Sequence, residues 1–490
     1  MDWADPSSCG SRKFRGVIDA PRWLFLVALV FAPWAYGCTR PWSAKMLSII
    51  LGGVFLLWAV GCALRRRWPK LPLVLSAAAF CLVAHGWWMA INAKSVFNPD
   101  LLVFIPRAAS LYSHFGSVDG KLSIATMIEM TALLGALLFT VDLAGRSVWR
   151  QRVLCAMALT GLSIALFGIV QKIGGTHILS WTWEPEKLDI ENNFALFRYR
   201  GNAGAYLNLI LPLVIGFTFH AFRKGKGQWA RAFWPSALVI VAAGIQLNPS
   251  RASWMIAALL TLSVVLLRCL RRFDSQEFGS RAFWKSAAFA AGGTASVALI
   301  CSLGQWQTGW NRLTEAGLNP RDRSPTEIYL AMVPDAGILG FGPGTFRAAF
   351  PSYQVSYDFG NRKVPQFWKT DSWLQAHNDY LQCLIEWGYL GGLMWTVVIA
   401  GGLWRASAAV RTANQGKSNE EGAGEAMPSS RKRSDTLMLG CAIVAISGVL
   451  VHALVDFPLQ IMSIQFYAVV LLGICWRETP RAPAAGSASE

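Results

Sequence analysis

A dense group of polar side chains stands at the start of an apolar run late in the chain. His377 is followed by Asn378 and Asp379, and then by Gln382 and Glu386. On a helix that begins near Asp379, Gln382 and Glu386 lie on one face, with His377 above the first turn. A neutral imidazole accepts a proton near pH 7, so the group fits general base catalysis beside hydrogen-bonding groups for a polar substrate. The alternative is helix capping by Asn378 and Asp379 around an ordinary interfacial histidine.

Arginines gather at two other ends of apolar runs. Arg198, Arg200 and Asn202 precede the run 203–222, and Arg251 lies in the short turn between 232–247 and 252–270. The planar guanidinium stays charged and donates paired hydrogen bonds, which suits the binding of a diphosphate. The alternative is that these arginines pair with lipid headgroups.

Apolar runs must position these groups, because 54% of the 490 residues are hydrophobic. A helix of about twenty residues crosses about 30 Å of hydrocarbon, and lipid offers no partner for an unpaired backbone amide. We therefore predict an all-α membrane protein with about twelve transmembrane helices in a single membrane domain, residues 1–490. The predicted spans are 23–38, 46–64, 71–91, 122–144, 152–170, 203–222, 232–247, 252–270, 284–303, 380–404, 437–455 and 459–476.

The distribution of positive charge predicts the orientation. Short loops on one side hold clusters of Lys and Arg, whereas the short loops on the other side hold only Arg40, Lys45 and Arg251. Cytoplasmic loops carry the excess of positive charge, so both termini are predicted to be cytoplasmic. Arg198, Arg200, Arg251 and His377 then face the outer side. The cytoplasmic clusters consist of Arg65, Arg66, Arg67, Lys70, Arg146, Arg150, Arg152, Arg223, Lys224, Lys226, Arg231, Arg268, Arg271, Arg272, Arg281 and Lys285.

Long connections add three further predictions. Residues 304–379 form a large outer loop rich in Trp, Tyr, Pro and Gly, which we expect to fold into short helices and to act as a lid. It contains Arg347, a further candidate for binding the substrate. Residues 405–436 are polar and charged, which is typical of a flexible cytoplasmic loop, and residues 478–490 are expected to be a disordered tail.

Composition also weighs against several classes of site. The net charge of +17 is spread between apolar runs, so nucleic-acid binding is not expected. The ten cysteines stand singly without metal-ligand spacing. The first outer loop, residues 39–45, contains no acidic residue, and no DxD motif lies in the other outer segments. The sequence therefore predicts an enzyme that uses no Mg²⁺, no Mn²⁺ and no cofactor.

Several short motifs, in this order, resemble the O-antigen ligase and polymerase superfamily of the WaaL/Wzy type. The order of the motifs and their membrane side carry the resemblance, which covers roughly residues 150–476. The motifs are Arg200-Gly201-Asn202 with Tyr206-Leu207-Asn208 and Leu211-Pro212, Ser250-Arg251-Ala252-Ser253, Gly340-Phe341-Gly342-Pro343-Gly344-Thr345-Phe346, the stretch from His377 to Gly391, and His452-Ala453-Leu454-Val455-Asp456-Phe457-Pro458.

The resemblance implies a metal-independent glycosyltransferase in the bacterial cytoplasmic membrane, with its active site facing the periplasm. Such an enzyme moves a glycan from undecaprenyl diphosphate to a hydroxyl of lipid A-core or of a growing polysaccharide. His377 would serve the acceptor, and Arg200 and Arg251 would bind the diphosphate. The other polar residues of the clusters would bind substrate; they are Arg198, Asn202, Arg347, Asn378, Asp379, Gln382 and Glu386.

Several alternatives remain open from the sequence. A ligase, a repeat-unit polymerase and a protein O-oligosaccharyltransferase share the motifs and differ in acceptor. A twelve-helix secondary transporter is the rival from another class, but it would place ionisable groups near the membrane midplane. His452 and Asp456, four residues apart, are expected to form an interhelical hydrogen bond.

Overall fold

The computed structural model describes most of the chain. The described residues are 15–98, 100, 103–107, 115–174, 193–222, 227–273, 325–357, 372–422 and 430–478. The predicted span 284–303 and almost all of the predicted tail 478–490 lie outside these residues, so the count of twelve spans stays a prediction.

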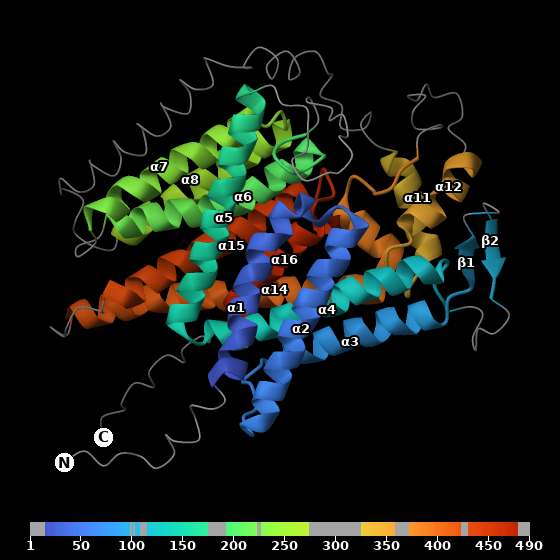
Figure 1. Ribbon diagram of the computed structural model, residues 1–490, viewed down its shortest axis with the longest axis horizontal. Helices are drawn as coiled ribbons and strands as arrows, with labels where there is room; N and C mark the ends of the chain where they lie inside the picture. The colour runs from blue at the N-terminus through green and yellow to red at the C-terminus, as the bar shows by residue number, and fades with distance from the viewer. Residues whose placement is uncertain are drawn as a thin grey trace.

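The described residues are mostly helical, as the apolar runs predict (Figure 1). Eight of their helices are long and apolar enough to cross a membrane, and α16 and part of α8 are shorter apolar helices. The longer helices are α1 (Arg15–Trp34), α2 (Pro41–Leu64), α3 (Leu73–Ile91), α4 (Gly120–Ala144), α5 (Ser147–Ile173), α6 (Arg200–Ala221), α7 (Gln228–Leu247), α8 (Arg251–Phe273), α14 (Asp379–Gly422), α15 (Ser430–His452) and α16 (Met462–Arg477).

The described residues are mostly helical, as predicted, with one short β-hairpin that the sequence did not indicate. Strands β1 (Ser95–Asn98) and β2 (Val103–Pro106) form an antiparallel hairpin between α3 and α4. Phe97 is paired with Phe104 in its register, and their ring centroids lie 5.2 Å apart. The strands are only four residues long, which is too short to stand out as a pattern in the sequence.

Helix α6 is the central helix of the bundle. It packs against α5, α7, α8 and α15, and nearly all of its side chains are buried. Small residues permit this close packing, since a Cβ at Gly204 would collide with Ser253 of α8. Helix α2, by contrast, exposes most of its apolar surface, as expected for a lipid-facing helix.

The large predicted outer loop, residues 304–379, contains two short helices among its described residues. These are α11 (Thr326–Ala336) and α12 (Phe346–Ser356), which lie beside the β-hairpin at the right-hand end of the bundle in Figure 1. They share a separate apolar core with the start of α14, in which Tyr329, Phe346 and Phe350 are fully buried.

Helix α14 is interrupted inside its apolar part, which hydropathy did not indicate. Gly388 has φ 65° and ψ −174°, so the helix breaks there. The freed backbone groups pair with the segment between α11 and α12: Phe341 N donates to Ile385 O at 2.9 Å and Leu390 N to Ile338 O at 3.0 Å. Non-helical backbone is tolerated in a membrane protein where other protein segments satisfy it.

The connection between α14 and α15 is shorter than the sequence predicts. Helix α14 continues to Gly422 and α15 begins at Ser430, so both helices extend into the range 405–436 that we expected to be a flexible loop.

Candidate active site

His377 lies immediately before α14 and is held there by a turn from far along the chain. Asp379 N donates to Ala453 O at 2.9 Å, and Asn378 Nδ2 donates to Leu454 O at 3.1 Å. The turn over residues 453–457 follows the end of α15. The two segments are therefore fixed against each other next to His377.

Asp456 supplies the main polar contact of His377. Its Oδ1 lies 3.2 Å from His377 Nδ1, with the carboxylate 2% and the imidazole 24% exposed. An ionised carboxylate accepts the Nδ1 proton and so leaves the lone pair on Nε2. Asp456 thus sets the tautomer in which Nε2 can accept a proton.

His452 lies behind Asp456. Its Nε2 is 3.9 Å from Asp456 Oδ2, and its side chain is 1% exposed. The two side chains face each other, but this distance is too long for the predicted hydrogen bond, and Asp456 lies in the turn after α15 rather than within the helix. No local sequence pattern links Asp456 to His377, because the two residues lie 79 positions apart in the chain.

Three aromatic rings surround the imidazole. Ring centroids of Phe457, Trp373 and Tyr199 lie 4.9, 5.6 and 6.3 Å from that of His377, each edge-on. Tyr199 and Phe457 also stack at 5.3 Å. Large apolar rings fix the orientation of the imidazole and reduce its access to water.

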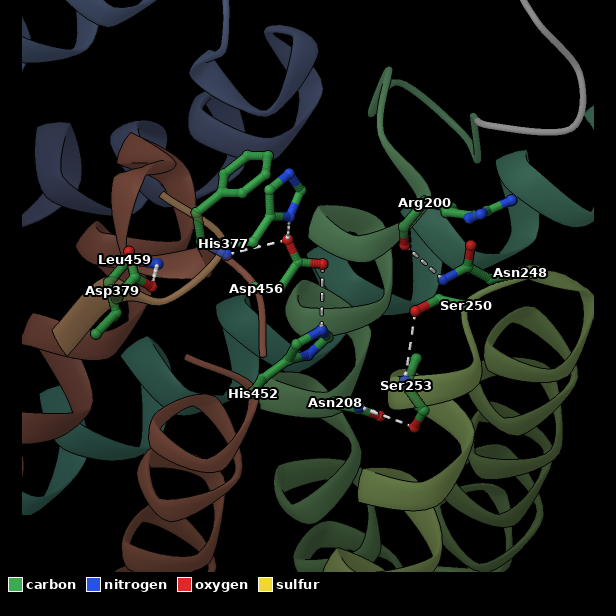
Figure 2. A network of polar contacts seen from close by, with 11 residues as sticks. Arg200, Asn208, Asn248, Ser250, Ser253, His377, Asp379, His452, Asp456 and Leu459 are labelled. Carbon is green, nitrogen blue, oxygen red and sulfur yellow. Dashed lines mark hydrogen bonds and ion pairs between the residues drawn. The ribbon is translucent and has the colours of Figure 1, made fainter. Parts of the chain in front are cut away.

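The start of α6 approaches the same carboxylate. A Cβ at Gly201 would collide with Asp456 Oδ2, so the glycine lets the first turn of α6 reach Asp456. Arg200 is the first residue of α6, which brings the predicted arginine motif next to the His377–Asp456 pair. In Figure 2 the Arg200 side chain extends to the side away from His377.

Arg251 begins the neighbouring helix α8. Ser250 Oγ accepts from Ser253 N at 3.4 Å, as at a helix N-terminus capped by serine. Asn248 Nδ2 donates to Arg200 O at 3.0 Å, and Asn208 Nδ2 of α6 donates to Ser253 O at 3.0 Å. Figure 2 shows these contacts on the right of the Asp456 carboxylate. The starts of α6 and α8, with their two arginines, are therefore tied together.

Two further arginines, Arg198 and Arg40, lie close enough to interact electrostatically. Partial burial lowers the pKa of Arg198, and the charge of Arg40 lowers this pKa further. Cations that repel one another favour an anionic ligand between them. Arg40 was not among the residues selected from the sequence, because a single loop arginine gives no distinctive pattern.

The polar residues that follow His377 make contacts within the protein. Asn378 Oδ1 caps α14 by accepting from Tyr380 N and Leu381 N, each at 3.0 Å. Asp379 accepts from Leu459 N and Gln460 Nε2, each at 2.8 Å. Both side chains thus hold the segments around His377.

Glu386 and Gln382 anchor the segment before α12. Glu386 is 4% exposed and accepts from Gly344 N at 3.0 Å, Phe346 N at 3.2 Å and Gln382 Nε2 at 3.0 Å. Arg347, at the start of α12, is exposed. Asn202, in the first turn of α6, is 3% exposed, and its Oδ1 has no hydrogen-bond partner within the described residues.

A large apolar cavity borders the site on the side opposite the arginines. Its volume is about 460 Å³, and its walls come from α4, α14, α15 and α16. Asp379, Glu386 and Gln460 lie on its wall together with apolar residues such as Leu384 and Ile399. None of its lining residues is Lys or Arg.

These positions can be compared with known proteins. Residues 236–396 match the O-antigen ligase family model. This confirms the resemblance given by the sequence motifs over about a third of the chain. The O-antigen ligase match includes Arg251 and His377 but not Arg200 or Asp456. No curated protein matches the chain.

Proposed function

We propose that this protein is a membrane glycosyltransferase that moves a glycan from an undecaprenyl-diphosphate carrier to an acceptor hydroxyl on the periplasmic face of the bacterial cytoplasmic membrane. The observation that carries the proposal is the contact between His377 Nδ1 and Asp456 Oδ1 at 3.2 Å, beside the start of α6. It supplies a base next to the predicted arginine motif.

In the proposed reaction, His377 accepts one proton. Nε2 accepts the proton of the acceptor hydroxyl, whose oxygen forms a bond to the anomeric carbon of the donor glycan. The bond between that carbon and the diphosphate oxygen breaks, and the electron pair leaves with the diphosphate. Asp456 stabilises the imidazolium that forms, and general base catalysis of this kind contributes about 10²- to 10⁴-fold in rate.

The arginines stabilise the leaving group. Negative charge grows on the diphosphate as the glycosidic bond breaks, and preorganised guanidinium groups and helix N-terminal amides lower the energy of that charge. Arg200 and Arg251 begin α6 and α8, and Arg198 and Arg40 lie on the same outer surface. The donor is therefore placed on the α6–α8 side of His377.

The polar residues of α14 have a positioning role in this proposal. Asn378, Asp379, Gln382 and Glu386 hold the turn and the α12 segment around the base, and Arg347 and Asn202 remain candidates for contacting sugar. The apolar cavity beside Asp379 lies on the other side of the site from the arginines, so in this proposal it holds the hydrocarbon part of a lipid-borne acceptor rather than the donor diphosphate.

A reconstituted assay tests the proposal. Purified protein in liposomes is given a glycan on undecaprenyl diphosphate together with lipid A-core, a second lipid-linked glycan or an acceptor peptide. We expect transfer to one acceptor, loss of at least about 10² in rate with His377→Ala, and no effect of a chelator. Transport of the donor without transfer would support a transporter instead, and loss of activity on chelation would contradict the metal-independent mechanism.

A further inference from the structure

A basic pocket lies at the opposite, cytoplasmic end of the bundle. Its volume is about 40 Å³, and α1, the end of α2 and the turn between α4 and α5 form its walls. Arg22, Arg65, Arg67 and Arg146 all line it. These arginines come from three separate parts of the chain, so the fold gathers their charge.

Carboxylates only partly neutralise this charge. Asp142 lines the pocket; it accepts from Trp58 Nε1 at 3.0 Å and lies 3.6 Å from Arg67. Asp19 pairs with Arg22 at the edge. The nearby Arg150 provides a contrast, because two carboxylates, Asp435 and Glu478, bind it at 2.7 and 2.9 Å. The pocket therefore retains an excess of cations.

The chain turns toward the pocket at the end of α2, where Arg66 has a backbone conformation that is unusual for a residue other than glycine. Arg66 has φ 51°, and Arg67 N donates to Cys62 O at 3.0 Å, as in a helix C-terminus of the kind that usually carries glycine. Arg65 and Arg67, on either side of Arg66, both reach the pocket as a result.

The size of the pocket and the apolar surface beside it indicate which ligand it binds. About 40 Å³ is room for about three water molecules, which is the scale of a phosphate group. On the last turns of α2, Leu56, Val60 and Leu64 are 64%, 49% and 61% exposed and form an apolar stripe next to the pocket. A phospholipid whose phosphate lies in the pocket would thus have its acyl chains along this stripe.

We infer that this pocket binds the phosphate of an anionic phospholipid from the cytoplasmic leaflet. Arginines around a pocket between transmembrane helices attract such a headgroup through its negative charge. The site is separate from the His377 region, and the inference does not depend on the proposed function.

The test measures lipid binding to the purified full-length protein in a neutral detergent by native mass spectrometry. Phosphatidylglycerol is compared with phosphatidylethanolamine, and inorganic phosphate is added as a competitor. The site variant is Arg65→Gln/Arg146→Gln. The control is Arg231→Gln/Arg411→Gln, which removes the same charge from exposed cytoplasmic positions elsewhere.

We expect the wild type and the control to bind phosphatidylglycerol about tenfold more tightly than phosphatidylethanolamine, and the site variant to lose this preference. A wild type without preference, or a site variant that keeps it, would overturn the inference. Displacement of phosphatidylglycerol by millimolar inorganic phosphate would assign the pocket to a soluble phosphate instead.

Discussion

The imidazole of His377 and the carboxylate of Asp456 are 3.2 Å apart, although one precedes α14 and the other follows α15. In the proposed reaction Asp456 orients the base, so Asp456→Asn should lower kcat by about 10² while leaving KM for the donor nearly unchanged. An asparagine amide can donate to Nδ1 and favour the wrong tautomer. The reconstituted transfer assay measures both constants.

Asp335→Asn is the matched control for this change. Asp335 accepts from Tyr353 Oη at 2.7 Å on the exposed surface of α11, away from His377. The same acid-to-amide change there should leave kcat within about twofold, since exposed hydrogen bonds contribute little. Equal kcat for Asp456→Asn and wild type would remove Asp456 from the mechanism.

The two helix-start arginines give a second prediction. Lysine keeps the charge but loses the paired hydrogen bonds of guanidinium, so Arg200→Lys and Arg251→Lys should each raise KM for the lipid-diphosphate donor by about tenfold. KM for the acceptor should change little. Initial rates at varied donor and acceptor concentrations separate the two effects.

Lys45→Gln removes a cation from the same outer side and serves as the control. If Arg200 and Arg251 only paired with lipid headgroups, lysine would replace them without loss. Lysine variants as active as Lys45→Gln would therefore contradict the assignment of diphosphate binding to these arginines.

The apolar runs predicted most of the observed helices from α2 to α8. A helix that crosses lipid needs a long apolar stretch, and such a stretch can be read directly from consecutive residues. The apolar runs also placed His377, Arg200 and Arg251 at helix starts. They did not predict the link between His377 and Asp456, the hairpin of β1 and β2, or the break at Gly388. Each of these depends on pairing between distant segments or on backbone geometry, which hydropathy does not record.

Glu386 gives a third prediction, on stability. Its carboxylate accepts from Gly344 N and Phe346 N, so Glu386→Ala leaves two backbone donors without their acceptor. Each lost partner of a buried donor costs about 1–3 kcal/mol. We expect a lower melting temperature in detergent and faster proteolysis of the α11–α12 segment.

Ser356→Ala is the control within the same segment. Ser356 Oγ donates to Ser352 O at 2.7 Å on the exposed end of α12, so its removal should be nearly neutral. Proteolysis of Glu386→Ala at the rate of Ser356→Ala would show that Glu386 does not anchor the segment.

The break in α14 gives the last prediction. Gly388 has φ 65°, and a Cβ there would collide with Ile338 O. Gly388→Ala should therefore cost more than the roughly 1–3 kcal/mol of this backbone conformation alone, because the pairing with residues 337–342 must also shift. Gly52→Ala is the matched control, since a Cβ at Gly52 meets nothing within 4 Å in a regular helix. That change should be neutral or stabilising by up to about 1 kcal/mol. If α14 were continuous in the membrane, Gly388→Ala would stabilise the protein as Gly52→Ala does. The interrupted helix instead predicts that Gly388→Ala lowers the melting temperature and that Gly52→Ala does not.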